Sequence, residues 1–228
     1  MKVLLVLAVL LGLAVLVDRV AVGVAEDRVG SELATTARLA GTPTVDITGF
    51  PFLTQAVAGR YDEVRIALDA QQLGQPEGTR ADLALQGVRV PLSAVLAGSV
   101  REVPVDRVDG TATLSYELLA TGLAADTTLA REGDGLRITR TVELLGRTVP
   151  LTAVGQATLE GSEVVIDVEQ ATGAGVELPG FLVARASDLL DLRYAVPPLP
   201  FGLRLTSVTP AEDGVVVGLE AVDTVVGG

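Results

Sequence analysis

The sequence predicts an α+β fold in which a curved antiparallel sheet wraps on helices, preceded by an N-terminal hydrophobic helix. Three observations support this prediction. Residues 3–17 form an unbroken apolar run at the start of the 228-residue chain. Short β segments separated by glycine-containing turns fill most of the remaining sequence. The few helical segments do not alternate regularly with those strands, as they would in a parallel α/β sheet.

The apolar run at residues 3–17 is typical of an export signal or a membrane anchor. Its fifteen residues fit the apolar core of a signal peptide, about 7 to 15 residues, better than a spanning helix of about 20. Gly23, Val24 and Ala25 then give a small-x-small pattern that signal peptidase could cleave. We therefore divide the chain into residues 1–25, a signal peptide or membrane anchor, and residues 26–228, a single domain outside the cytoplasm.

Residues 20–40 are predicted to be helical, because apolar residues recur there every three or four positions. Gly41, Thr42 and Pro43 end that helix. The next stretch predicts a strand, a tight apolar corner, a helical turn and a second strand, at residues 45–48, 49–52, 53–58 and 61–68.

The rest of the chain is predicted to be mainly β structure. Hairpins are expected for 81–85 with 88–91 across Gln86-Gly87, for two strands about Asp109-Gly110 within 107–115, for 127–132 with 136–144, for 147–160 with 162–169, and for 203–208 with 215–219. Short helices are expected at 92–96, 116–123 and 184–190.

Composition excludes several classes of function. The chain has 17 basic and 29 acidic residues, which argues against nucleic acid and against purely electrostatic docking on anionic membranes. With no cysteine and no histidine, it lacks thiol chemistry, Ser-His-Asp hydrolysis and ordinary zinc sites. We expect no catalytic residues, no metal and no cofactor. Carboxylate pairs at Asp62-Glu63 and Asp188/Asp191 are the remaining candidates for a hydrolase.

The four phenylalanines lie at bends between elements, each beside a proline or a glycine. Large side chains at the ends of β segments either fill an ordinary core or line an apolar slot. Burial of one acyl chain in such a slot contributes about 0.8 kcal/mol per CH₂ group. The candidate lipid-binding residues are Phe50, Phe52, Leu53, Phe181, Leu199 and Phe201, and the candidate headgroup contacts are Arg60, Arg193 and Arg204, each beside an apolar corner.

Three blocks, residues 47–55 (ITGFPFLTQ), 59–64 (GRYDEV) and 199–205 (LPFGLRL), are the most distinctive in the chain. Together with the N-terminal apolar run, they resemble the LmeA-like phospholipid-binding family of actinobacterial cell envelopes, over about residues 3–220. The resemblance implies an exported, often membrane-tethered protein that binds phospholipid and supports lipoglycan assembly. It also implies a fold similar to half of a tubular lipid-binding (TULIP-like) domain, and it brings no catalytic residues.

The expected function is therefore non-enzymatic phospholipid binding outside the cytoplasm, in support of cell-envelope lipid or lipoglycan assembly. The protein is expected to be anchored to the cytoplasmic membrane or secreted into the envelope. Its expected partners are a phospholipid or other acyl lipid and the membrane contacted by the N-terminal segment, with no nucleic acid. The alternative is a non-catalytic envelope scaffold or interaction protein that has no lipid cavity and binds another protein through its acidic face.

Overall fold

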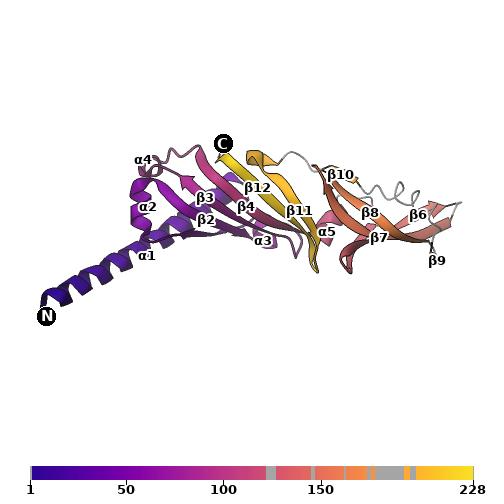
Figure 1. Cartoon of the computed structure of the whole chain (residues 1–228), viewed down its shortest axis with the longest axis horizontal. Helices are drawn as coiled ribbons and strands as arrows, with labels where there is room; N and C mark the ends of the chain where they lie inside the picture. The colour runs from indigo at the N-terminus through magenta and orange to yellow at the C-terminus, as the bar shows by residue number, and fades with distance from the viewer. Residues whose placement is uncertain are drawn as a thin grey trace.

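The computed structural model describes residues 2–121, 127–144, 147–161, 163–173, 176–177, 193–195 and 199–227. A long helix, a first sheet and a second sheet follow one another along an elongated molecule (Figure 1). Both sheets are antiparallel, and helices do not alternate regularly with strands. The predicted α+β class is therefore confirmed.

One continuous helix, α1 (Lys2–Thr36), runs from the apolar N-terminal run into the domain. The side chains of residues 3–17 are exposed, whereas Val22 is buried and Ala25 and Leu33 pack against the main core. Within the described ranges, α1 is the one helix long and apolar enough to cross a membrane. The helix predicted at residues 20–40 is confirmed as far as Thr36.

The first sheet has the strand order β1-β2-β3-β4-β12-β11. Its strands are β1 (Thr44–Thr48), β2 (Arg60–Leu68), β3 (Arg80–Arg89), β4 (Val103–Ser115), β12 (Gly214–Val226) and β11 (Arg204–Pro210). One cross-strand row consists of buried residues that share a core with α1: Ile47, Val64, Leu85, Val108 and Ala221. Because side chains alternate along a strand, the adjacent row faces away from α1 and is polar.

Short helices connect or follow strands of this sheet. They are α2 (Phe52–Ala58), α3 (Ala70–Leu73), α4 (Leu92–Leu96), α5 (Tyr116–Thr121) and the single turn η1 (Pro200–Gly202). Asp69 and Gln72 cap α3 reciprocally, each side chain accepting from the other residue's backbone N–H. Figure 1 shows α2 and α4 at the end of the first sheet near which α1 leaves the domain.

The second sheet has the strand order β10-β8-β7-β6-β5, with β9 paired to β8. Its strands are β5 (Thr127–Glu132), β6 (Gly135–Leu144), β7 (Arg147–Glu160), β8 (Glu163–Gly173), β9 (Val176–Glu177) and β10 (Arg193–Ala195). A shared cluster joins the two sheets, because Leu136 of β6 packs with Val215 and Val217 of β12. Tyr116 packs against the same cluster, and its hydroxyl donates to the carbonyl oxygen of Ala211 at 2.7 Å.

Three predicted hairpins are confirmed, those formed by β5–β6, β7–β8 and β11–β12. Two others are wrong, because β3 and β4 are single unbroken strands. Gly87 has a φ of 64° within β3, and a Cβ there would overlap the Asp106 carboxylate of β4. Gly110 likewise leaves room for the Leu83 side chain on the neighbouring strand. Both glycines therefore permit close strand packing and do not form turns.

The predicted short helices at 92–96 and 116–123 correspond to α4 and α5. The helix predicted at 184–190 lies outside the described residues, as do the candidate lipid contact Phe181 and the carboxylate pair Asp188/Asp191.

Replacing Val105 with alanine tests the core of the first sheet, because Val105 is completely buried. We expect Val105→Ala to lower the free energy of unfolding by about 2 kcal/mol, since two methyl groups lose their contacts and leave a cavity. Chemical denaturation of the full chain in mild detergent measures this change. Val222→Ala, at a half-exposed position of β12, is the control and should change stability by less than about 0.5 kcal/mol. Equal losses in both variants would contradict the assignment of this core.

Candidate functional site

The corner that contains α2 places apolar side chains on both faces of one short helix. The helix follows Pro51 and ends at Gly59, which has a φ of 67°. Phe52 points inward, is 6% exposed and packs with the Tyr61 ring, with centroids 6.1 Å apart. Leu53 and Val57, one turn apart, point outward with exposed fractions of 40% and 77%.

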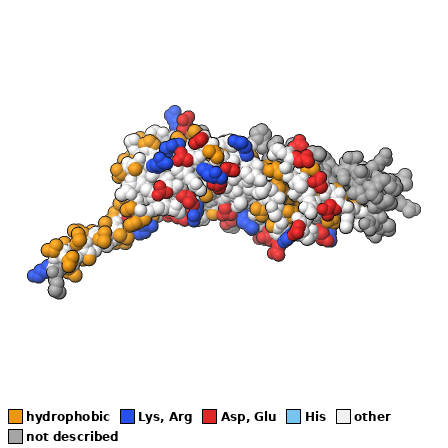
Figure 2. Space-filling view, in the orientation of Figure 1, with side chains coloured by type: hydrophobic (Ala, Val, Ile, Leu, Met, Phe, Trp, Pro, Cys, Tyr) orange, Lys and Arg blue, Asp and Glu red, His pale blue; other side chains and the backbone are white. Residues whose placement is uncertain are grey.

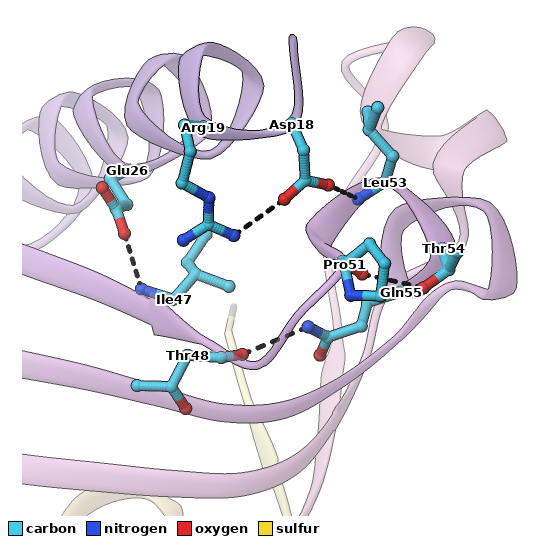
Figure 3. Close-up of polar contacts among 9 residues, drawn as sticks. All are labelled: Asp18, Arg19, Glu26, Ile47, Thr48, Pro51, Leu53, Thr54 and Gln55. Atoms are coloured by element: carbon cyan, nitrogen blue, oxygen red, sulfur yellow. Dashed lines mark hydrogen bonds and ion pairs between the residues drawn. The ribbon is translucent and has the colours of Figure 1, made fainter. Parts of the chain in front are cut away.

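Hydrogen bonds tie this corner to α1 at the end of the apolar run. The Asp18 carboxylate is buried and accepts from the Leu53 backbone N–H at 2.8 Å and from the Arg19 guanidinium at 2.7 Å. The same guanidinium lies over the Phe50 ring, 5.3 Å from its centroid. Figure 3 shows the Asp18 carboxylate between α1 and the start of α2. The α2 corner is therefore held beside residues 18 and 19 of α1.

Two further side chains fix the strands that lead into and out of the corner. Glu26 of α1 accepts a hydrogen bond from the Ile47 backbone N–H at 2.9 Å (Figure 3). Gln55 is 9% exposed, donates to the Thr48 carbonyl oxygen at 3.2 Å, and accepts from the Asp62 backbone N–H at 2.8 Å. Sequence reasoning missed Asp18, Glu26 and Gln55, because each acts through a backbone group distant in the sequence or in another element.

The second apolar corner, around η1, lies at the same end of the first sheet. Leu199 is partly buried, and Phe201 is 42% exposed. The Phe201 carbonyl oxygen accepts a hydrogen bond from Thr224 of β12, and Leu203 packs on the core that contains Phe52. The structure thus brings together the two described corners that the sequence singled out.

Other exposed apolar side chains gather around these corners. They are Val95 and Leu96 on α4, Val100 in the following loop, and Val222 and Val225 on β12. In Figure 2, hydrophobic side chains cover the protruding part of α1 and recur at the end that carries α2 and α4. We call this surface, with Phe50, Leu53, Val57 and Phe201, the apolar end of the first sheet.

Arginines flank the apolar end. Arg60 follows Gly59, the cap of α2, and Arg89 precedes α4. Both arginines bind the single carboxylate of Asp106, at 3.2 and 2.8 Å. This triplet carries a net charge of +1 and is largely exposed. Arg204 is exposed, lines a hollow of about 330 Å³ with Val222, and makes no ion pair with any described residue. Arg193 begins β10 in the second sheet, and its side chain is outside the described part of the chain.

A hollow of about 700 Å³ lies on the face of the first sheet opposite α1. Four carboxylates, those of Asp46, Asp82, Asp109 and Glu220, line it together with one guanidinium, that of Arg65. Arg107 binds two of them, at 2.8 Å to Asp109 and 2.8 Å to Glu220, and the hydrogen bond to Asp109 raises the pKa of the guanidinium. Figure 2 shows charged side chains spread over the sheet region. The acidic lining disfavours an anionic lipid headgroup in this hollow.

No group of three or more metal-ligating side chains occurs among the described residues. Of the carboxylate pair Asp62-Glu63, the Glu63 side chain forms an ion pair with Arg65, and Asp62 is exposed. Such ion pairs are common on protein surfaces. The pair Asp62-Glu63 therefore has the arrangement of ordinary surface charges.

Comparison with known protein families places most of the chain in one family. The model of a family described as LmeA-like phospholipid-binding matches residues 16–220. The matched region begins within α1, two residues before Asp18, and extends into β12. No curated protein and no solved structure matches the chain.

Replacing Gln55 tests the polar support of the α2 corner. We expect Gln55→Ala to lower the free energy of unfolding by about 2 kcal/mol, because the Thr48 carbonyl and the Asp62 N–H lose their partner in a partly buried place. Denaturant titration of the full chain measures the change, with the exposed Gln71→Ala as matched control. If the two glutamine variants are equally stable, Gln55 does not hold the corner.

Proposed function

The chain belongs to the LmeA-like phospholipid-binding family, and from this premise we propose that it is a membrane-anchored, extracytoplasmic protein that binds phospholipid and supports cell-envelope lipid or lipoglycan assembly. The observation that carries the proposal is the family match across most of the chain, together with the apolar end of the first sheet. We further propose that the protein is not an enzyme, needs no cofactor, and acts by holding or presenting lipid.

We propose that the N-terminal segment is retained as an anchor. Cleavage after Ala25 would remove Val22 from the core and Asp18 from the Leu53 backbone N–H. It would also expose the sheet face that Ala21 and Ala25 help to cover. Retention preserves these contacts and leaves residues 26–228 as one lipid-binding domain fixed to the membrane by α1.

The lipid is proposed to lie at the apolar end, with acyl-chain contacts from Phe50, Leu53, Leu199 and Phe201. Phe52 supports this surface from the core, since it is almost completely buried. Phe181, outside the described residues, stays in the proposal on the sequence pattern. Each CH₂ group taken from water contributes about 0.8 kcal/mol, so contact with the two exposed rings, of Phe50 and Phe201, and with Leu53 would hold part of a chain.

The phosphate is proposed to be bound by arginine. Arg60 and Arg89 share one carboxylate, so the pair retains a net positive charge for an anionic group. Arg204 lies three residues beyond Phe201 and is exposed. Arg193 remains a candidate on sequence grounds alone.

A second candidate function is a scaffold that binds another protein. The acidic hollow opposite α1 favours it, because carboxylates from four strands line a concave surface. A basic segment of a partner would suit that lining. This candidate predicts that substitutions at the apolar end leave partner binding unchanged.

Native mass spectrometry of the full chain, released from a mild detergent after incubation with phosphatidylinositol or phosphatidylethanolamine, tests lipid binding. We expect a stoichiometric complex with phospholipid, reduced about tenfold in Phe201→Ser, because loss of a ring contact of about 1.4 kcal/mol is tenfold in affinity. Val24→Ser, at an exposed valine of α1, is the matched control. A folded chain that retains none of the added lipids would refute lipid binding and favour the scaffold function.

The intact mass of the protein produced in an exporting bacterial host tests anchor retention. We expect an N-terminus at or next to Met1 and recovery in the membrane fraction, because α1 carries core residues on both sides of Ala25. A soluble product that begins at Glu26 and remains folded would refute the retained anchor.

A further inference from the structure

The apolar run of α1 is too short to cross a bilayer alone. Residues 3–17 are fifteen in number, and at about 1.5 Å rise per residue they cover about 22 Å. The hydrocarbon core of a bilayer is about 30 Å thick, so about 8 Å is left uncovered. A deficit of this kind is met by thinning of the bilayer or by the residues that follow the run.

The residues that follow are Asp18 and Arg19, and neither is presented to lipid as an isolated charge. The Asp18 side chain is 4% exposed; the Arg19 guanidinium offsets its charge, and the Leu53 N–H donates a hydrogen bond to it. These partners replace the water molecules that would otherwise bind the carboxylate, as a charged group needs where water is scarce. This arrangement also places the α2 corner at the depth where the apolar run ends.

The surface at that depth is apolar on two neighbouring helices. Phe50, Leu53 and Val57 extend from the α2 corner, and Val95, Leu96 and Val100 from α4 and its following loop, with 77% of Val57 and 79% of Leu96 exposed. The ends of α2 and α4 are joined by the hydrogen bond from the Val90 N–H to the Gly59 carbonyl at 3.0 Å. We call these six residues the α2–α4 platform.

Two arginines adjoin the platform in the chain. Arg60 follows the last residue of the α2 cap, and Arg89 stands two residues before Pro91, the N-cap of α4. The pair shares the Asp106 carboxylate and keeps one net positive charge. Apolar side chains with adjoining arginines are the pattern of elements that sit in the interfacial layer, with the cations at the level of the phosphates.

We propose that the α2–α4 platform inserts into the interfacial layer of the same bilayer that α1 crosses, and so forms a second membrane contact that fixes the orientation of the domain. The proposal rests on α1 remaining in the membrane, but it needs no lipid bound in a separate site. The occupant is the phospholipid bilayer, because the platform is continuous with α1 through Asp18 and makes up the missing apolar length. Docking at two points prevents α1 and the first sheet from rotating together, relative to the bilayer, about the axis of α1.

Labelling tests this arrangement, since the chain has no native cysteine. Full-length Val57→Cys and Leu96→Cys variants are labelled with a small fluorophore and placed in nanodiscs of phosphatidylcholine and phosphatidylglycerol. Spin-labelled phosphatidylcholine, with the quencher near either end of the acyl chain, reports depth. Thr128→Cys, exposed on β5 of the second sheet, is the control position.

We expect at least twofold stronger quenching at residues 57 and 96 than at 128, rising smoothly with the fraction of quencher lipid and greatest for the quencher nearest the headgroup. Val57→Asp combined with Val95→Asp should abolish the difference at a label on residue 96, whereas Thr128→Asp should not. Lipid retention by native mass spectrometry, measured on the same variants, separates docking from the proposed function.

Quenching at residue 96 equal to that at 128 would overturn the docking proposal, whether or not the chain retains lipid. Strong quenching in a chain that retains no lipid would uphold docking and refute the separate lipid site. Protection from aqueous iodide without quenching by lipid would also overturn the proposal, in favour of a second copy of the chain covering the platform. The single-cysteine comparison decides the question even if the double aspartate variant fails to fold.

Discussion

The packing of the second half of α1 against one face of the first sheet is the interaction on which the rest of the structure depends. Val22 is buried there among strand residues, and Ala25 and Leu33 extend the contact. The same helix carries the apolar run without a break. Because a helix is stiff over this length, insertion of the apolar run into a membrane, as proposed, would also set the orientation of the domain. Hydrogen bonds from Leu53 and Ile47 to α1 carboxylates then fix the rotation of the sheet about the helix.

This packing also decides where lipid can be held. The second half of α1 covers part of the apolar face of the first sheet, where Val22, Ala25 and Leu33 pack on the core. The opposite face carries a hollow lined by four carboxylates, which would repel an anionic headgroup. Apolar side chains and surplus positive charge meet at the end of the sheet near Arg60 and Arg89. We therefore propose both lipid binding and membrane docking at that end, on neighbouring sets of residues.

Local patterns predicted much of the fold and failed where a residue serves a distant strand. The glycine-centred hairpins at residues 133–135 and 161 were predictable, because turn chemistry is contained in a few adjacent residues. Gly87 and Gly110 carry the same local pattern and lie inside the unbroken strands β3 and β4. Their role is to admit Asp106 and Leu83 across the sheet, and no short window of sequence contains that information. Phe52 shows the same limit, because the sequence grouped it with exposed rings that it supports from beneath.

The sequence by itself determined the apolar run, the helical state of residues 20–36, the antiparallel β class, the family and the absence of histidine and cysteine chemistry, since each is a property of composition or of local spacing. The predicted apolar stripe of that helix was correct for Val22, Ala25 and Leu33, whereas Val29 and Ala37 are exposed. Tertiary structure alone decided that residues 18, 53 and 201 lie toward one end of one sheet, and that Arg60 and Arg89 share a carboxylate with Asp106. Periodicity specifies which face of an element is buried. It does not specify strand order or register, and only these bring side chains distant in sequence to a common surface.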